Sequence, residues 1–125
     1  MAPKANRPVI LIVEDELLLR INAVELITEA GFDVVEAGDA EEAIAILEAR
    51  SDIHIVFTDI QMPGSMDGLK LARFIRGRWP PIKLVVTSGQ AAIRDGDLPE
   101  GGVFIGKPYT SAEISATLRE LAHLS

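Results

Sequence analysis

The sequence contains no cysteine, which excludes disulfide bonds and thiolate metal sites and is typical of a reducing compartment. It has no apolar run near the roughly 18 residues that a transmembrane helix needs. The apolar run that ends at Val13 is short for the core of a signal peptide, and acidic residues follow it at once. We therefore expect a cytoplasmic protein without a membrane partner.

Basic residues are also scarce: Lys and Arg total 12 against 19 Asp and Glu, and the net charge is −7. This balance argues against nonspecific binding of nucleic acid. Four cations nevertheless gather in one stretch, and we interpret them as complementing a helix C-terminus, with a partner-docking patch as the alternative. These cations are Arg73, Arg76, Arg78 and Lys83.

The chain has 125 residues, of which 48% are hydrophobic and 25% charged, as in ordinary globular proteins. This length suits one domain with one sizeable core. No internal repeat or linker divides the sequence. We expect a single domain over residues 1–125, with its core at about 8–122 and no effector domain.

Strand-like and helix-like segments alternate along the chain. Val9 to Val13 is continuous and apolar, as in a strand buried on both faces. Asp39 precedes Glu42 by three residues, a spacing typical of a helix N-cap, and Thr110 with Glu113 repeats it. The expected strands are 9–13, 33–36, 53–58, 82–87 and 103–105, and the expected helices are 16–30, 40–49, 67–76 and one that begins near 110.

Three expectations concern particular segments. In the first helix, the row predicted to face the core is Leu17, Ile21, Val24 and Ile27. Gly77 is expected to end the third helix. Between the last two strands lies SGQAAIRDGDLPEGG, where Gly and Pro break most of the helix that the alternation demands. Only Gln90 to Arg94 suits a helix, so we predict a single turn or an irregular loop there.

Five strands with helical crossovers predict an α/β fold, a doubly wound five-stranded parallel sheet covered on both faces. In the flavodoxin-like strand order 2-1-3-4-5, ligands bind at the carboxyl ends of the strands, near the switch point between the first and third strands.

The carboxyl ends of four predicted strands carry a distinctive set of polar residues. Neighbouring carboxylates repel each other, and a hard cation relieves this repulsion. Oxygen ligands without His or Cys favour Mg²⁺ over zinc. A carboxylate beside Mg²⁺, a lysine and a hydroxyl suits phosphoryl transfer, with the carboxylate as nucleophile. Each residue alone has a plain structural explanation, such as Asp15 as a helix cap, but their joint placement favours a site. The set is Glu14, Asp15, Glu16, Asp59, Thr87, Ser88, Gly89, Lys107 and Pro108.

The motifs LIVEDE, FTDIQMPGSMDG, VVTSG and FIGKPYT stand in this order over about Pro8 to Leu121. With them the chain resembles a bacterial response-regulator receiver domain of two-component signalling, of the CheY-like superfamily and the stand-alone type. The resemblance implies a phosphoprotein that is no turnover enzyme: it catalyses only its own phosphorylation and dephosphorylation. A sensor histidine kinase or a histidine phosphotransfer protein would supply the phosphoryl group, and Mg²⁺ or Mn²⁺ would be the cofactor.

The same resemblance implies a role for each site residue. Asp59 matches the phosphoacceptor, and Asp15, Asp59 and the backbone carbonyl of Gln61 match the metal ligands, with Glu14 acting through water. Thr87 and Lys107 match the groups that contact the phosphoryl oxygens, and Ser88 matches the small residue that leaves the site open. Thr87 with Phe104 matches the conformational switch, Gln61 and Gly89 are expected to tune dephosphorylation, and Pro108 is expected to follow a cis peptide bond.

The sequence departs from the family pattern at three places. Glu14 stands where Asp is the more frequent choice, and MPGSMDG has one residue more than the usual turn. The short helix-4 region makes the usual dimer through that helix doubtful, so we expect a monomer or weak homodimer. The protein would either contact a downstream protein or act as a shuttle or sink for phosphoryl groups, and the sequence leaves both outputs open.

Two other functions share parts of this pattern. One is a pseudo-receiver that binds partners without phosphate, against which Asp15, Asp59, Thr87 and Lys107 argue. The other is a phosphatase of the haloacid dehalogenase type, which needs a second acid two residues after its nucleophile. Gln61 occupies that place.

Overall fold

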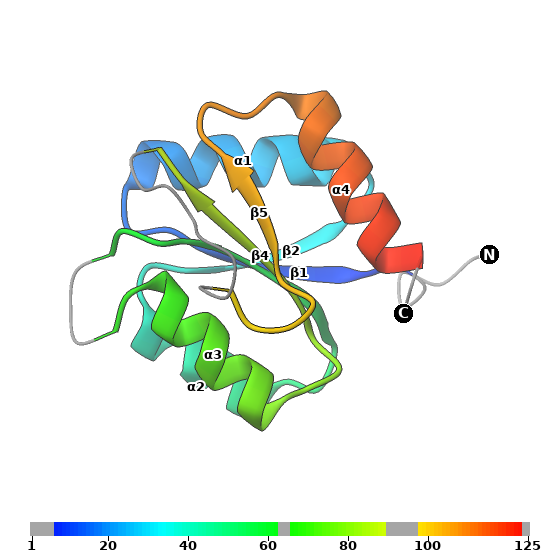
Figure 1. Cartoon of the computed structure of the whole chain (residues 1–125). Helices are drawn as coiled ribbons and strands as arrows, with labels where there is room; N and C mark the ends of the chain where they lie inside the picture. Colours follow the sequence, from blue (N-terminus) through cyan, green and yellow to red (C-terminus); the bar gives the residue numbers. More distant parts are fainter. Residues whose placement is uncertain (1–6, 63–65, 90–97, 124–125) are drawn as a thin grey trace.

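The structure, a computed structural model, describes residues 7–62, 66–89 and 98–123. Five parallel strands form one sheet in the order β2-β1-β3-β4-β5, which confirms the predicted fold. Helices α1 and α4 lie on one face of the sheet, and α2 and α3 lie on the other (Figure 1). The elements are β1 (Val9–Val13), α1 (Leu17–Glu29), β2 (Asp33–Ala37), α2 (Ala40–Ala49), β3 (Ile53–Asp59), α3 (Gly68–Arg78), β4 (Lys83–Ser88), β5 (Val103–Gly106) and α4 (Ser111–His123).

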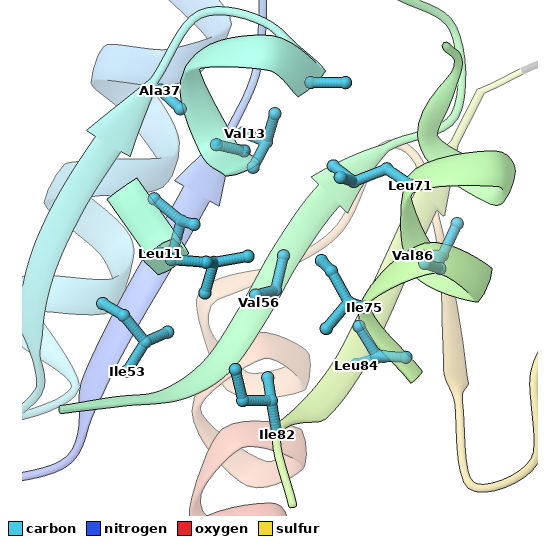
Figure 2. Packing of buried hydrophobic residues seen from close by; sticks show 14 of the residues in the cluster. Leu11, Val13, Ala37, Ile53, Val56, Leu71, Ile75, Ile82, Leu84 and Val86 are labelled. Carbon is cyan, nitrogen blue, oxygen red and sulfur yellow. The ribbon is translucent and has the colours of Figure 1, made fainter. Parts of the chain in front are cut away.

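The core consists of two apolar layers, because successive side chains of a strand point to opposite faces. Leu11 and Val13 of β1 belong to the layer under α2 and α3, whereas Ile10 and Ile12 belong to the layer under α1 and α4. Figure 2 shows Ile75 of α3 beside strand residues in the first of these layers. Each fully buried Leu or Ile contributes about 1.5–3 kcal/mol relative to an exposed one. The layers thus hold the strand ends, and the side chains on them, in fixed positions.

The prediction for the inward row of α1 was wrong in its first half. Leu17 and Ile21 are 58% and 44% exposed, while Ala23 and Ile27 are buried. The start of this helix is apolar on nearly every side, so its periodicity does not single out one face. The row centred on Ala23 and Ile27 packs against the sheet because it includes the small side chain that lets the helix approach closely.

The prediction that Gly77 ends α3 was also wrong. The helix continues to Arg78, and the N–H of Trp79 donates to the Ile75 carbonyl at 2.7 Å. A glycine ends a helix when it adopts a left-handed conformation, and among the described residues only Gly31 and Gly101 have a positive φ. The helix ends instead before the pair of prolines, which disfavour helical backbone in the preceding residue.

Arg76 of α3 holds the described part of the connection between β4 and β5. Its guanidinium donates to the Pro80 carbonyl at 2.9 Å and to the Glu100 carbonyl. Leu98 packs against the apolar layer under α3. The predicted helical stretch at 90–94 and the turn residues 63–65 lie outside the described residues.

Two of the clustered cations stand in the last turn of α3, as the helix-terminus interpretation predicts. Arg78 also forms an ion pair with Glu48 of α2 at 3.1 Å. Within the described ranges, no helix has the length and apolar character needed to cross a membrane.

Candidate functional site

The site lies at the carboxyl end of the sheet, where Asp59 is the last residue of β3. Its backbone pairs in register with Thr87 of β4, and the Ile60 N–H donates to the Thr87 carbonyl at 2.9 Å. The backbone of Lys107 donates to the Ser88 carbonyl at 3.0 Å, which ties the loop after β5 to the same edge. The ladder therefore sets the positions of Asp59, Thr87 and Lys107 relative to one another.

Three carboxylates converge beside this strand end. Glu14, Asp15 and Asp59 each offer an oxygen, and these oxygens lie within 4.8 Å of one another. Glu14 and Asp59 are each only 6% exposed, whereas Asp15 is exposed. A pocket of about 380 Å³ opens over the cluster and is lined in part by Asp15, Asp59, Gln61 and Lys107.

Lys107 is the cation that faces these acids. Its Nζ lies 3.1 Å from Asp59 Oδ2 and 3.3 Å from Glu14 Oε1. Burial lowers the pKa of Lys107, but the hydrogen bond and charge of Asp59, together with Glu14, outweigh it and raise the pKa overall. Lys107 is therefore charged at neutral pH.

The negative charge of Glu14 is unfavourable in its buried position. Burial raises the pKa of Glu14, and the charge of Asp59 raises it further. The Glu16 N–H, which donates to Glu14 Oε2 at 3.2 Å, and the Lys107 ammonium act in the opposite direction without reversing the shift. One ammonium thus does not fully compensate the buried negative charge.

The second carboxylate oxygen of Asp59 shows which kind of ligand fits the site. Asp59 Oδ1 is buried and, among the described residues, has no hydrogen-bond partner. A buried carboxylate oxygen without a partner is costly, and a cation can satisfy it. The ligand atoms beside it are the carboxylate oxygens of Glu14 and Asp15, which suit Mg²⁺ or Mn²⁺. The residues present therefore fit a hard divalent cation.

Gly68 is a site residue to which the sequence reasoning assigned no role. A Cβ at this position would stand 2.0 Å from the Asp59 carbonyl oxygen, far inside van der Waals contact. The Gly68 N–H donates to the Ile60 carbonyl at 2.9 Å, so the first turn of α3 rests directly on the strand end. The signal was present as the last glycine of FTDIQMPGSMDG. Only the packing reveals that this glycine lets α3 approach Asp59.

The end of β4 supplies two hydroxyl side chains. Thr87 is 1% exposed and Ser88 is 3% exposed. Ser88 Oγ donates to Gln61 Oε1 at 3.1 Å, which connects β4 to the loop after β3. A Cβ at Gly89 would lie 3.5 Å from Lys107 Cβ, an ordinary contact, so the backbone there has room for a small side chain.

Two further predicted residues lie on or after β5. Phe104 is partly buried and packs against the apolar layer under α2 and α3. The Lys107–Pro108 peptide bond is cis. Phe104 and Lys107 therefore lie on one short segment that joins the acidic cluster to the α3 side of the sheet.

Comparisons with known proteins place this geometry in a family. The family model for the response regulator receiver domain matches residues 10–119. The chain is 38% identical over 122 residues to the aerobic respiration control protein ArcA of Escherichia coli (strain K12), covering 91% of this chain and 48% of ArcA. It is 34% identical over 116 residues to the sensor kinase CckA of Brucella abortus (strain 2308), covering 90% of this chain and 12% of CckA. The chain thus spans half or less of these curated relatives.

A solved structure agrees with both the fold and the family. The response regulator receiver protein from Sinorhizobium medicae WSM419 is 30% identical, with a TM-score of 0.86 over 93% of this chain and 94% of that one. The shared region includes the acidic cluster and the strand ends that carry it. This chain belongs to the response regulator receiver domain family of two-component systems.

Proposed function

We propose that Asp59 accepts a phosphoryl group from a histidine kinase or a histidine phosphotransfer protein, with Mg²⁺ or Mn²⁺ as the cofactor. The observation that carries this proposal is the state of the Asp59 carboxylate. It is buried, one oxygen faces the Lys107 ammonium, and the other has no partner among the described residues. Such a group is oriented and partly compensated, yet open to a further electrophile or cation.

The transfer is a substitution at phosphorus. An Asp59 oxygen forms the new P–O bond as the P–N bond of the donor phosphohistidine breaks, and the departing nitrogen keeps the bonding electrons. Lys107 and the Thr87 hydroxyl contact the phosphoryl oxygens and stabilise their charge. Asp15, Asp59 and the backbone carbonyl of Gln61 would hold the cation, with Glu14 acting through water. When bound, the cation supplies charge neutralisation for the transferred group.

Water attack on the phosphorus returns Asp59 to its free state. Gln61 and Gly89 border the same pocket as Asp59, so their side chains, or the lack of one, set how water approaches. This position supports a role for both residues in the lifetime of the acyl phosphate.

The phosphoryl group would act on a pre-existing equilibrium between two arrangements of Thr87 and Phe104. The output would be contact with a downstream protein, or return of the phosphoryl group along a relay. Phosphorylation-dependent affinity for a defined partner distinguishes the first output, and rapid back-transfer to the phosphotransfer protein distinguishes the second.

The first test is the intact mass of the protein after exposure to acetyl phosphate, with and without Mg²⁺. We expect a gain of one phosphoryl group, about 80 Da, that requires Mg²⁺ and disappears in Asp59→Asn. Beryllofluoride, a phosphoryl mimic, should shift the backbone NMR signals of 87 and 104 in the wild type. If neither the mass nor these signals change, the proposal is wrong and the chain is a binding module.

A further inference from the structure

We propose that Arg20 is a positioning residue for the metal site, although it touches none of the proposed ligand atoms. This inference rests on the proposed function, because the site it supports is the proposed cation site. Arg20 stands in the second turn of α1, and its side chain is only 22% exposed. Its guanidinium reaches back under the loop that carries Glu14 and Asp15.

Arg20 joins two elements at the carboxyl end of the sheet. Its Nη1 donates to the backbone carbonyl of Glu14 at 3.0 Å, and its Nε donates to Glu36 Oε1 of β2 at 3.2 Å. A guanidinium holds such donors in one rigid plane, so the two contacts fix each other. The peptide that joins Glu14 to Asp15 is thereby tied to β2 through Glu36.

The backbone carbonyl of Glu14, to which Arg20 donates, lies just beyond the last backbone N–H that β2 could offer it. The Glu14 N–H still donates to the Ala37 carbonyl at 3.1 Å, which extends the β1–β2 ladder by one step. The next step of a parallel ladder would need the N–H of residue 39. There the chain turns away, since Asp39 is the N-cap of α2. The Arg20 guanidinium serves as donor to this carbonyl and so fixes the peptide that leads into Asp15.

The neighbouring backbone leaves room for this arginine. A Cβ on Gly38 would stand 3.1 Å from Arg20 Nη1, closer than most real contacts. A side chain at 38 would therefore press on the guanidinium. The fit of Arg20 against Gly38 indicates a defined position rather than a loosely solvated surface arginine.

The charge of Arg20 and its contact with the Glu14 carbonyl predict opposite changes in Mg²⁺ affinity when Arg20 is removed. Removing a cation near three acids should strengthen Mg²⁺ binding, whereas releasing the Glu14 carbonyl should weaken it. A neutral exchange separates the two effects. Arg20→Met combined with Glu36→Gln removes both members of the pair, so the net charge stays constant and only the positioning is lost.

The experiment is an NMR titration of the phosphate-free protein with Mg²⁺ alone. We expect the Arg20→Met, Glu36→Gln protein to bind Mg²⁺ about tenfold more weakly, the lower end of the loss typical of outer partners of metal ligands. The matched control is Arg50→Met with Asp52→Asn, which removes an exposed ion pair of 2.6 Å with the same neutral exchange. That control should bind Mg²⁺ as the wild type does.

Equal affinities in all three proteins, or an equal loss in both variants, would overturn the role of Arg20. If the double variant fails to fold, Arg20→Lys decides the matter, because it keeps the charge but reaches only one of the two acceptors. A folded Arg20→Lys protein should bind Mg²⁺ more weakly than the wild type, and unchanged affinity overturns the inference. Absence of Mg²⁺ binding by the wild type overturns the proposed function together with this inference, so the two failures are distinguishable.

Discussion

The two ends of the parallel sheet carry charge in different ways. Among the described residues, three ion pairs stand at or near the amino end, each with one cation and one acid, and every side chain in them is 36–53% exposed. At the carboxyl end, the side chain of Lys107 is 19% exposed and faces two acids, Glu14 and Asp59, whose side chains are 8% and 7% exposed. The pairs at the amino end are Arg7–Asp33, Arg50–Asp52 and Arg78–Glu48.

Distance alone does not separate the two ends. The Arg50–Asp52 contact, at 2.6 Å, is shorter than either contact of Lys107. Exposed pairs are screened by water and contribute little, whereas buried charges are costly unless fully compensated. The amino end is therefore an ordinary solvated surface. The carboxyl end is a site with unbalanced negative charge, so substitutions there should disturb the protein more than substitutions at the amino end.

The largest effect should come from Gly68→Ala, which disturbs the approach of α3 to Asp59. The new Cβ would meet backbone atoms of Asp59 and Ile60, none of which can rotate away. We expect a loss of stability of about 3 kcal/mol, at the upper end of overpacking costs, and little phosphoryl acceptance at Asp59. Urea unfolding and intact mass after acetyl phosphate measure the two effects.

Gly77→Ala is the matched control, since it makes the same substitution in the same helix. A Cβ at Gly77 would have nothing within 4 Å. Alanine in an exposed helical position is favoured over glycine, so this variant should gain about 0.5–1 kcal/mol. A similar loss of stability in both variants would show that the close approach at Gly68 is not the cause.

The sequence predicted the fold because its signals were local and mutually consistent. The buried strands are continuous apolar runs, and Asp39 and Thr110 begin helices with capping pairs whose hydrogen bonds the structure contains. The acidic cluster followed from topology, since parallel strands bring Glu14 and Asp59 to one edge. Once the strand order is known, the positions of these features in the fold follow from it.

The features that the sequence did not predict depend on packing between segments. Leu17, Leu18 and Leu19 begin α1 with apolar side chains on several sides, and only contact with the sheet selects Ala23 and Ile27. Gly68 and Gly77 are both helical glycines, and only the neighbourhood of Asp59 distinguishes them. The Arg20 contacts span β2 and the loop after β1, and no spacing in the sequence encodes them.

A smaller effect on stability should come from Glu14→Gln, and its sign should differ between EDTA and Mg²⁺. Burial, together with the charge of Asp59, raises the pKa of Glu14 in the folded protein. Protonated Glu14 contributes fully to the stability of the folded protein at pH values below its pKa in the unfolded chain. This contribution is lost as the pH rises through the pKa of Glu14 in the folded protein. At neutral pH with EDTA, the neutral glutamine should therefore raise the melting temperature. This gain should vanish as the pH falls toward the range where Glu14 is protonated in both states.

In excess Mg²⁺, the wild type should instead have a higher melting temperature than Glu14→Gln. A cation that binds the folded state stabilises it in proportion to its affinity, and the wild type offers one more carboxylate than Glu14→Gln. Melting curves in EDTA and in excess Mg²⁺ test both halves of the prediction. A Glu14→Gln protein that is less stable in EDTA would mean that Lys107 more than compensates the buried acid.

The smallest effect should come from Ser88→Ala, which removes the hydroxyl that donates to Gln61 Oε1 at 3.1 Å. While that bond exists, the amide carbonyl of Gln61 is engaged away from incoming water. Its release should let the carbonyl accept a hydrogen bond from the attacking water and so speed hydrolysis of the acyl phosphate. We expect about a threefold faster loss of phosphate, in keeping with the worth of one neutral hydrogen bond. The decay of phosphorylated protein after removal of the donor gives the rate.

The same substitution in a Gln61→Ala background separates this route from any direct influence of Ser88 on the phosphoryl group. If Ser88 acts through Gln61, Ser88→Ala should leave the decay rate of the Gln61→Ala protein unchanged, because the amide it restrains is already gone. A threefold acceleration in both backgrounds would place the effect of Ser88 at the phosphoryl group itself. The comparison also bears on the two ends of the sheet. A single hydrogen bond at the carboxyl end would then alter how long the protein stays phosphorylated, whereas removal of the 2.6 Å ion pair at the amino end should leave that lifetime unchanged.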